Sequence, residues 1–282
     1  MVVATDFSPG SPLALGRAAL LPLAPGAEVV LVHAVRPGRE SLVEEEARGR
    51  IDAEVPRVEA ALAGVGASAV TVRGVVVRGG SVGAVVEAAN EVGADLLIAG
   101  KRGAGGWPRT YLGSTAERLA WTAQRPVLLV GTDPPGPYAR PLVALDTGPE
   151  AERILESALR VCPAPSGMEL LHAWDVEFAG WIGASDPTGA TLDRLRGAVR
   201  AEGATFLDDL RDRLRDAGVS VTCLLRRGDP RPTVLTACRD RRSDLVTVGT
   251  HRRGGVVGQA LVGSVALAVI RSAPCDVLAV PA

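Results

Sequence analysis

The sequence predicts an α/β protein built as two tandem, doubly wound domains, each around a five-stranded parallel sheet. Short apolar runs alternate with helical patterns along all 282 residues, which is typical of parallel strands joined by right-handed helical crossovers. The two halves also repeat. Equivalent positions are Asp6 and Asp146, His33 and His172, Gly100 and Gly249, and Gly113-Ser114 and Gly263-Ser264. An apolar content of 47% over this length suffices for two hydrophobic cores.

The first half contains five apolar runs and four helical segments. We expect strands near 1–5, 28–35, 70–77, 95–99 and 127–130, and helices near 11–23, 40–63, 81–92 and 114–123. In the segment 81–92, Val82, Val85, Val86 and Ala89 share one face, which predicts a helix packed on the core. Ser81 is the candidate cap of that helix.

The second half follows the same order. We expect strands near 142–146, 168–174, 219–226, 244–248 and 276–280, and a long helix over 191–217 whose Arg and Asp residues form a solvated, ion-paired face. Residues 131–140 hold three prolines and two glycines, which exclude a helix or a central strand. The expected division is therefore a first domain over 1–133, a linker over 134–140 and a second domain over 141–282.

The composition argues against several classes of partner. The net charge is −1 and aromatic residues make up 3%, so neither an electrostatic field nor stacking platforms for nucleic acid are expected. No apolar run is long enough for a membrane helix, and the sequence opens in a strand rather than a signal peptide. The four cysteines form no C-x-x-C pair, which favours buried thiols over a metal site. We expect a cytoplasmic protein, and the abundance of Ala, Gly, Pro and Arg indicates a bacterial source.

A glycine-rich stretch over 100–115 joins the strand at 95–99 to the helix at 114–123. Glycines let backbone N–H groups approach a phosphate, and a helix amino end favours an anion. Lys101, the only lysine in the chain, is a candidate for an ionic contact to that phosphate. The stretch is neither a Walker A loop nor a dinucleotide fingerprint, since Pro108 stands where the latter needs glycine. A plain turn remains the alternative, with Ser114 and Glu117 forming a capping box.

The spacing is G-x-x-G, nine residues, then G-[ST], and it occurs together with Ala-Thr-Asp-Phe-Ser-Pro at 4–9 and Val-Leu-Val-His-Ala at 30–34. This combination resembles the ATP-binding members of the universal stress protein family. The resemblance implies an adenine-nucleotide α-hydrolase-like fold with strand order 3-2-1-4-5 in each half. It also implies an aspartate that contacts adenosine and backbone contacts to adenine from Ala34. The nucleotide-binding residues expected from the resemblance and the loop are Thr5, Asp6, Phe7, Ala34, Gly100, Lys101, Gly103, Gly113, Ser114 and Thr115.

The second half carries an altered loop. Arg252 replaces the second motif glycine, one extra residue precedes Gly263, and Val265 stands where the first half has Thr115. A Cβ at position 252 obstructs close backbone approach, although Arg252 and Arg253 also bring positive charge. We expect a degenerate or weaker second site. Its candidate residues are Asp146, Ala173, Gly249, Gly263 and Ser264.

The sequence designates no nucleophile with its base, so we expect a binding protein rather than an enzyme. The resemblance implies a tandem, ATP-binding stress-response regulator, with Mg²⁺ as a candidate companion of the phosphates. The alternatives are an interaction module that binds no nucleotide, or a weak ATPase. In the family the last strands pair across a dimer, which implies that 127–130 and 277–280 pair within this chain as a pseudo-dimer. Further homodimerisation and a protein partner stay open, and His33 and His172 are expected to be core histidines.

Overall fold

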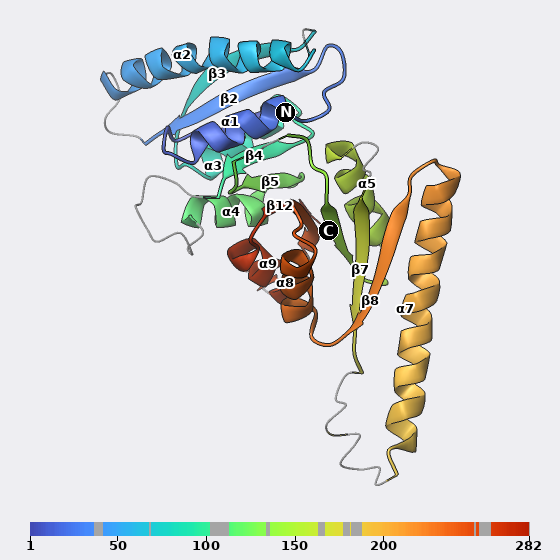
Figure 1. Cartoon of the computed structure of the whole chain (residues 1–282). Coiled ribbons are helices and arrows are strands. Elements are labelled where there is room, and N and C mark those ends of the chain that lie inside the picture. Colours follow the sequence, from blue (N-terminus) through green and yellow to red (C-terminus); the bar gives the residue numbers. More distant parts are fainter. Residues whose placement is uncertain are drawn as a thin grey trace.

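Figure 1 shows the computed structural model of the chain, in which helices cover both faces of one central sheet. The structure describes residues 1–36, 42–67, 69–101, 113–133, 136–162, 167–176, 181, 188–250, 252–253 and 261–281. Within these ranges no helix is both long and apolar enough to cross a lipid bilayer.

The first half runs strand by helix, as its sequence pattern predicts. Its elements are β1 (Val2–Ala4), α1 (Ser11–Ala19), β2 (Glu28–Val35), α2 (Leu42–Gly64), β3 (Thr71–Arg78), α3 (Gly83–Glu91), β4 (Leu97–Gly100), α4 (Ser114–Thr122) and β5 (Val127–Val130). The strands are parallel to one another, in the order β3-β2-β1-β4-β5. Helix α3 starts at Gly83 without a side-chain cap, so the expected role of Ser81 is wrong.

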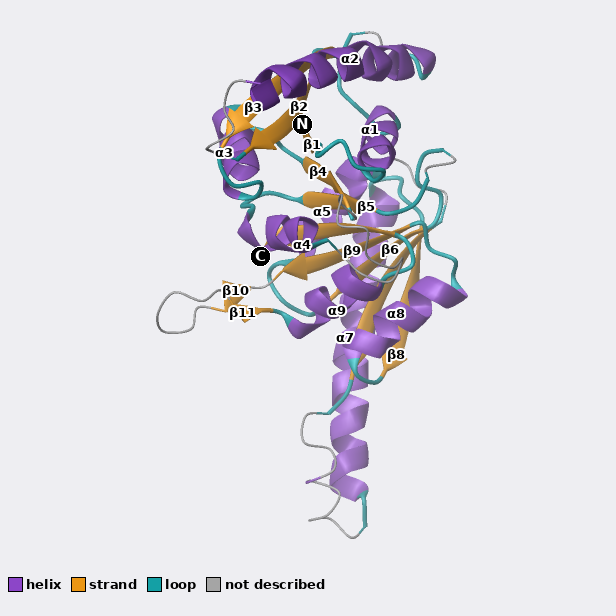
Figure 2. Ribbon diagram, turned by 90° about the vertical axis from the view of Figure 1, so that its left-hand side faces the viewer, coloured by secondary structure: helices purple, strands orange, loops and turns teal. Residues whose placement is uncertain are grey.

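The second half repeats this path. Its elements are β6 (Pro141–Leu145), α5 (Ala151–Val161), β7 (Met168–Trp174), α7 (Ala190–Asp216), β8 (Val221–Arg227), α8 (Pro230–Asp240), β9 (Leu245–Thr250), β10 (Arg252–Arg253), β11 (Leu261–Val262), α9 (Ser264–Ser272) and β12 (Asp276–Pro281). Figure 2 shows two departures from the first half: α7 extends well past the sheet, and the short β10–β11 ladder stands apart from it.

The two halves meet through their last strands. β5 and β12 pair antiparallel, with Val127 opposite Ala279 and Leu129 opposite Val277. The order across the whole sheet is therefore β3-β2-β1-β4-β5-β12-β9-β6-β7-β8. This arrangement confirms the strand order predicted for each half and the internal pseudo-dimer.

Two apolar cores run along the two faces of the sheet and cross the junction between the halves. Helices α1, α2, α5 and α7 contribute to the first core, and α3, α4, α8 and α9 contribute to the second. In the first core, Leu128 and Val130 of β5 share a cluster with Leu278 of β12 and Val143 of β6. Since both cores are continuous, the hydrophobic effect holds the halves together as one body.

A buried polar cluster also joins the halves, beside the β5–β12 junction. Asp276 is fully buried; it accepts hydrogen bonds from Gly131 N at 2.9 Å, the Thr132 hydroxyl at 2.8 Å and the Tyr138 hydroxyl at 2.8 Å. Arg17 of α1 lies 3.4 Å from Asp276 and stacks 3.8 Å above the Tyr138 ring. Because a buried carboxylate needs such partners, the cluster fixes how the linker and both halves meet.

Candidate functional site

The edge at which the crevice is expected is the one where β1 and β4 end side by side. Ala4 pairs with Val32 of β2 on one side and with Ala99 of β4 on the other, so the strand order reverses at β1. This is the topological switch point, where open α/β sheets bind ligands beyond the carboxyl ends of their strands. Thr5, which follows β1, and Gly100, which ends β4, come together at this edge.

Asp6 is exposed at the mouth of the crevice and is held by a tight turn. Its Oδ1 accepts hydrogen bonds from Ser8 N at 2.9 Å and from the Ser11 hydroxyl at 3.1 Å. Asp6 therefore has a structural role in this turn. The same turn also orients the carboxylate at the end of β1, which is compatible with a ligand contact.

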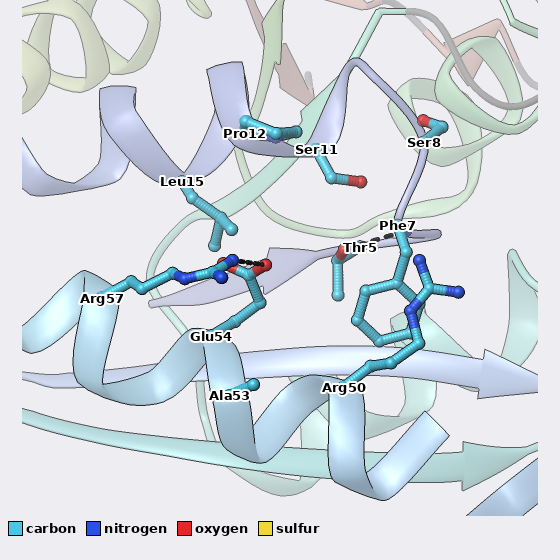
Figure 3. A pocket seen from close by; sticks show the side chains of 10 residues that line it. All are labelled: Thr5, Phe7, Ser8, Ser11, Pro12, Leu15, Arg50, Ala53, Glu54 and Arg57. Atoms are coloured by element: carbon cyan, nitrogen blue, oxygen red, sulfur yellow. Dashed lines mark hydrogen bonds and ion pairs between the residues drawn. The ribbon is translucent and has the colours of Figure 1, made fainter. Parts of the chain in front are cut away.

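Phe7 adopts a left-handed backbone conformation, with a φ of 56°. Its N–H donates to Thr5 Oγ1 at 3.1 Å, and its ring centroid lies 4.5 Å from that of His33. The Arg50 guanidinium lies 4.2 Å from the centroid of the same ring (Figure 3). A non-glycine residue with positive φ costs on the order of 1–3 kcal/mol and is found mainly at functional turns. The contacts of the Phe7 ring with His33 and Arg50 stabilise this turn.

His172 is buried, as expected of a core histidine, whereas its equivalent His33 is only half-buried. His33 donates from Nδ1 to Thr5 O at 2.8 Å, and His172 donates to Leu145 O at 3.0 Å. One residue further along β2, Ala34 lies beyond the last residue of β1. Because alternate residues of a parallel strand point their backbone groups to the same neighbour, and Val32 O bonds Thr5 N, the backbone of Ala34 faces the crevice side.

Helix α4 opens onto the crevice without a side-chain cap. Gly113 is its N-cap, Ser114 and Thr115 are exposed, and within the described part of the chain no side chain caps the first N–H groups. The capping box that was the alternative to phosphate binding does not form, because the Glu117 carboxylate instead pairs with Arg271 at 2.6 and 3.0 Å. An uncapped helix start of this kind is suited to an anion.

Lys101 was a candidate for a contact to phosphate, but its side chain reaches the second half of the chain instead. The side chain is 8% exposed, its stem packs against Gly131, and its ammonium donates to Ala273 O at 3.3 Å and to Cys275 O. The stem is buried by apolar contact, and the ammonium finds carbonyls at the carboxyl end of α9. The backbone of Lys101 contacts the start of α4, where Gly113 N donates to Lys101 O at 2.8 Å. Gly103 lies outside the described residues.

A cavity of about 310 Å³ opens beside the Asp6 turn, between that turn, α1 and α2. Its lining combines Thr5, Phe7 and Ser11 with Arg50 and the Glu54–Arg57 ion pair of α2 (Figure 3). Arg50 is a residue that the sequence analysis missed. No local pattern marks it, because α2 reaches Phe7 only through the tertiary fold.

The second half places its candidate residues in similar positions with fewer polar contacts. Asp146 is exposed and accepts a local hydrogen bond from Thr147 N at 2.9 Å, and Ala151 occupies the position of Ser11. The two backbone candidates also lie near strand ends: Ala173 is half-buried near the end of β7, and Gly249 lies near the end of β9. Helix α9 begins at Ser264 after Gly263, also without a side-chain cap.

The altered loop uses part of its backbone for internal pairing. Arg252 pairs with Val262 and Arg253 with Leu261, in an antiparallel ladder that sequence reasoning missed. Backbone groups engaged in such a ladder are not turned toward a common anion. Among the described residues of both halves, no three His, Cys, Asp or Glu side chains gather to hold a metal ion.

Comparison with known proteins gives a consistent assignment. The profile of the universal stress protein family matches residues 1–131 and again residues 137–281. A universal stress protein of Mycobacterium tuberculosis is 27% identical over 296 residues, which cover 99% of this chain and 95% of that protein. Another from the same organism is 31% identical over 204 residues, which cover 69% of this chain but only 63% of the relative.

A solved structure supports the fold over nearly the full length. The crystal structure of a universal stress protein from Archaeoglobus fulgidus matches with a TM-score of 0.70 at 20% identity, over 99% of this chain and 97% of that chain. With one family match in each half and the mirrored strand order, the chain belongs to the universal stress protein family, as a tandem member.

Proposed function

We propose that the first half binds one adenine nucleotide, ATP, and that the chain acts as a nucleotide-dependent stress-response regulator without catalysis of its own. The proposal assigns the first domain to residues 1–133, the linker to 134–140 and the second domain to 141–282. The observation that carries it is the exposed, uncapped start of α4 beside the Asp6 turn, at the switch point of the sheet.

Each part of this edge suits one part of the ligand. The amino end of α4 offers N–H donors and a positive dipole to the phosphates, worth about 0.3–1 kcal/mol for an exposed anion and up to ~2 kcal/mol when partly buried. The Asp6 carboxylate accepts hydrogen bonds from ribose hydroxyls, and the backbone of Ala34 meets the adenine edge. Mg²⁺ would accompany the phosphates and neutralise part of their charge.

The second half is proposed to bind weakly or not at all. Its Asp146 lacks the serine that braces Asp6, and the ladder between β10 and β11 engages backbone groups of the loop. The proposed protein is therefore asymmetric despite its repeated fold.

The repeat supplies a matched experiment. Asp6→Asn keeps an acceptor for Ser8 N but removes the charge that ribose hydroxyls would meet. Because a hydrogen bond to a charged group contributes ~1.5–3 kcal/mol, we expect ATP to bind roughly 10- to 100-fold more weakly in calorimetric titration. Asp146→Asn is the control and should leave the affinity unchanged. Equal losses in both variants, or no loss with Asp6→Asn, would contradict the proposal; phosphate release during the titration would favour the weak ATPase.

A further inference from the structure

Two polar contacts cross from the base of the first loop to the second half. The loop base consists of Lys101 and Gly113, which are joined by the Gly113 N to Lys101 O bond of 2.8 Å. From this base the Lys101 side chain reaches Ala273 O and Cys275 O, where α9 ends and β12 is about to begin. The start of the first nucleotide loop is thus attached to the end of a helix in the other half.

The second contact starts one turn into α4. Glu117 forms a two-bond ion pair with Arg271, with 2.6 Å from Nη2 to Oε1 and 3.0 Å from Nε to Oε2. Arg271 lies in the last turn of α9, two residues before Ala273. Both contacts from the loop base therefore converge on the same end of α9.

The chemistry of that helix end explains why cations gather there. The last carbonyls of an α-helix have no partner within the helix and carry the negative end of its dipole. Lys101 satisfies the carbonyl of Ala273, the C-cap residue, and Arg271 adds a positive charge in the last turn. The amino end of α4 brings the opposite dipole charge, with Glu117 in its first turn.

The repeat shows that this attachment runs in one direction only. Thr250 is the equivalent of Lys101, and its hydroxyl bonds Val280 O within its own half at 3.2 Å. Leu267 and Trp121 are the equivalents of Glu117 and Arg271, and they cannot form an ion pair. The second loop therefore has no counterpart of these two contacts in the first half.

We propose that the end of α9 is a positioning element for the first nucleotide site, acting through Lys101, Glu117 and Arg271. The second half sets the position of the first loop base and of the α4 amino end, whether or not it binds ligand itself. The affinity of the first site then depends on Arg271, a residue of the other half. This inference rests on the proposed nucleotide site.

The single lysine makes the attachment measurable. Amine-selective acylation, followed by peptide mass analysis, reports how accessible the Lys101 ammonium is, since no other side chain of the chain carries an amine. The full-length protein is labelled and titrated with ATP in parallel, as wild type and as Arg271→Gln. Arg125→Gln is the matched control, because Arg125 bonds Asn90 Oδ1 and Ala94 O within the first half.

We expect Arg271→Gln to speed Lys101 acylation and to weaken ATP binding about two- to fivefold, the range of a partly exposed, two-bond ion pair. Arg125→Gln should change neither quantity. Arg271→Lys keeps the charge without the two-bond geometry and should recover part of the affinity, which a merely structural loss would not do. If Arg271→Gln does not fold, Glu117→Gln removes the same pair from the other side.

The outcomes separate the two claims. Wild-type protein that binds no ATP overturns the proposed site and this inference with it. Wild-type binding with unchanged affinity and unchanged Lys101 reactivity in Arg271→Gln overturns this inference alone.

Discussion

At the scale of single residues, buried charge decides what several side chains do. Lys101 was expected at a phosphate because of its place in the loop, and it lies instead against backbone carbonyls of the other half. Arg17 and Asp276 form a buried pair that no local pattern predicts, because the two residues lie in different halves. Such contacts depend on how the halves dock, which a residue's neighbours in the sequence do not determine.

Tyr138 offers a test of that buried cluster. Burial, and then the neighbouring Asp276 carboxylate, raise the pKa of Tyr138 well above its ordinary value of 10.0. Because the pKa of Tyr138 is higher in the folded than in the unfolded protein, the protonated side chain stabilises the fold. This stabilisation is complete below pH ~10, the unfolded pKa, and is lost as the pH rises toward the folded pKa.

We therefore expect that, of the two tyrosines in the chain, Tyr138 ionises only when the protein unfolds in alkali. Tyrosinate absorbance, followed together with circular dichroism, checks this. In Tyr138→Phe the absorbance step that coincides with unfolding should disappear. Smooth ionisation of both tyrosines near pH ~10 in folded wild-type protein would show that the cluster is open to water.

At the scale of elements, the packing of α2 on β3 depends on one glycine. A Cβ built on Gly74 would lie 1.8 Å from Ile51 Cγ2, far inside contact distance, and Ile51 is 1% exposed. Because the core is close-packed, the helix or the strand must shift to admit a methyl group there.

We expect Gly74→Ala to lower the free energy of unfolding by about 1–3 kcal/mol, measured by urea denaturation. Adding Ile51→Ala should recover part of the loss by making room for the methyl group. Gly49→Ala, on the same helix, meets no atom within 4 Å and should stabilise by up to ~1 kcal/mol. If Gly74→Ala left the free energy of unfolding unchanged, α2 would have to lie further from the sheet than the structure places it.

Most helices and strands could be predicted from the sequence, whereas the residues at which they begin and end were harder to predict. The strand and helix positions followed from apolar runs and from the repeat, since both cores demand the same pattern twice. The start of α4 differed in a way that matters: Ser114 and Glu117 fit a capping box locally, yet Arg271 takes the Glu117 carboxylate. The β10–β11 ladder was missed because its two-residue strands leave no periodicity to read.

At the scale of the whole molecule, a duplicated fold carries an asymmetric set of contacts. The mirrored strand order and the shared cores make the halves equivalent in architecture. The contacts of Lys101, Glu117 and Arg271 occur at one loop only, and the serine that braces Asp6 is alanine in the second half. The repeat was readable from the sequence, and the resemblance supplied the pairing of the last strands. The contacts of Lys101 and Glu117 with the second half could not be predicted from the sequence, because they join residues more than 150 positions apart.

The most direct test of the central claim is the number of adenine nucleotides bound per chain. Purified protein is denatured to identify any released nucleotide, and the emptied, refolded protein is titrated with ATP. The titration is repeated with Gly113→Val and with Gly263→Val. Both glycines have extended backbone angles that valine accepts, so the added bulk at each helix start is the main change. The account predicts one site, which Gly113→Val removes and Gly263→Val leaves intact. Two equal sites, or one lost only with Gly263→Val, would contradict it.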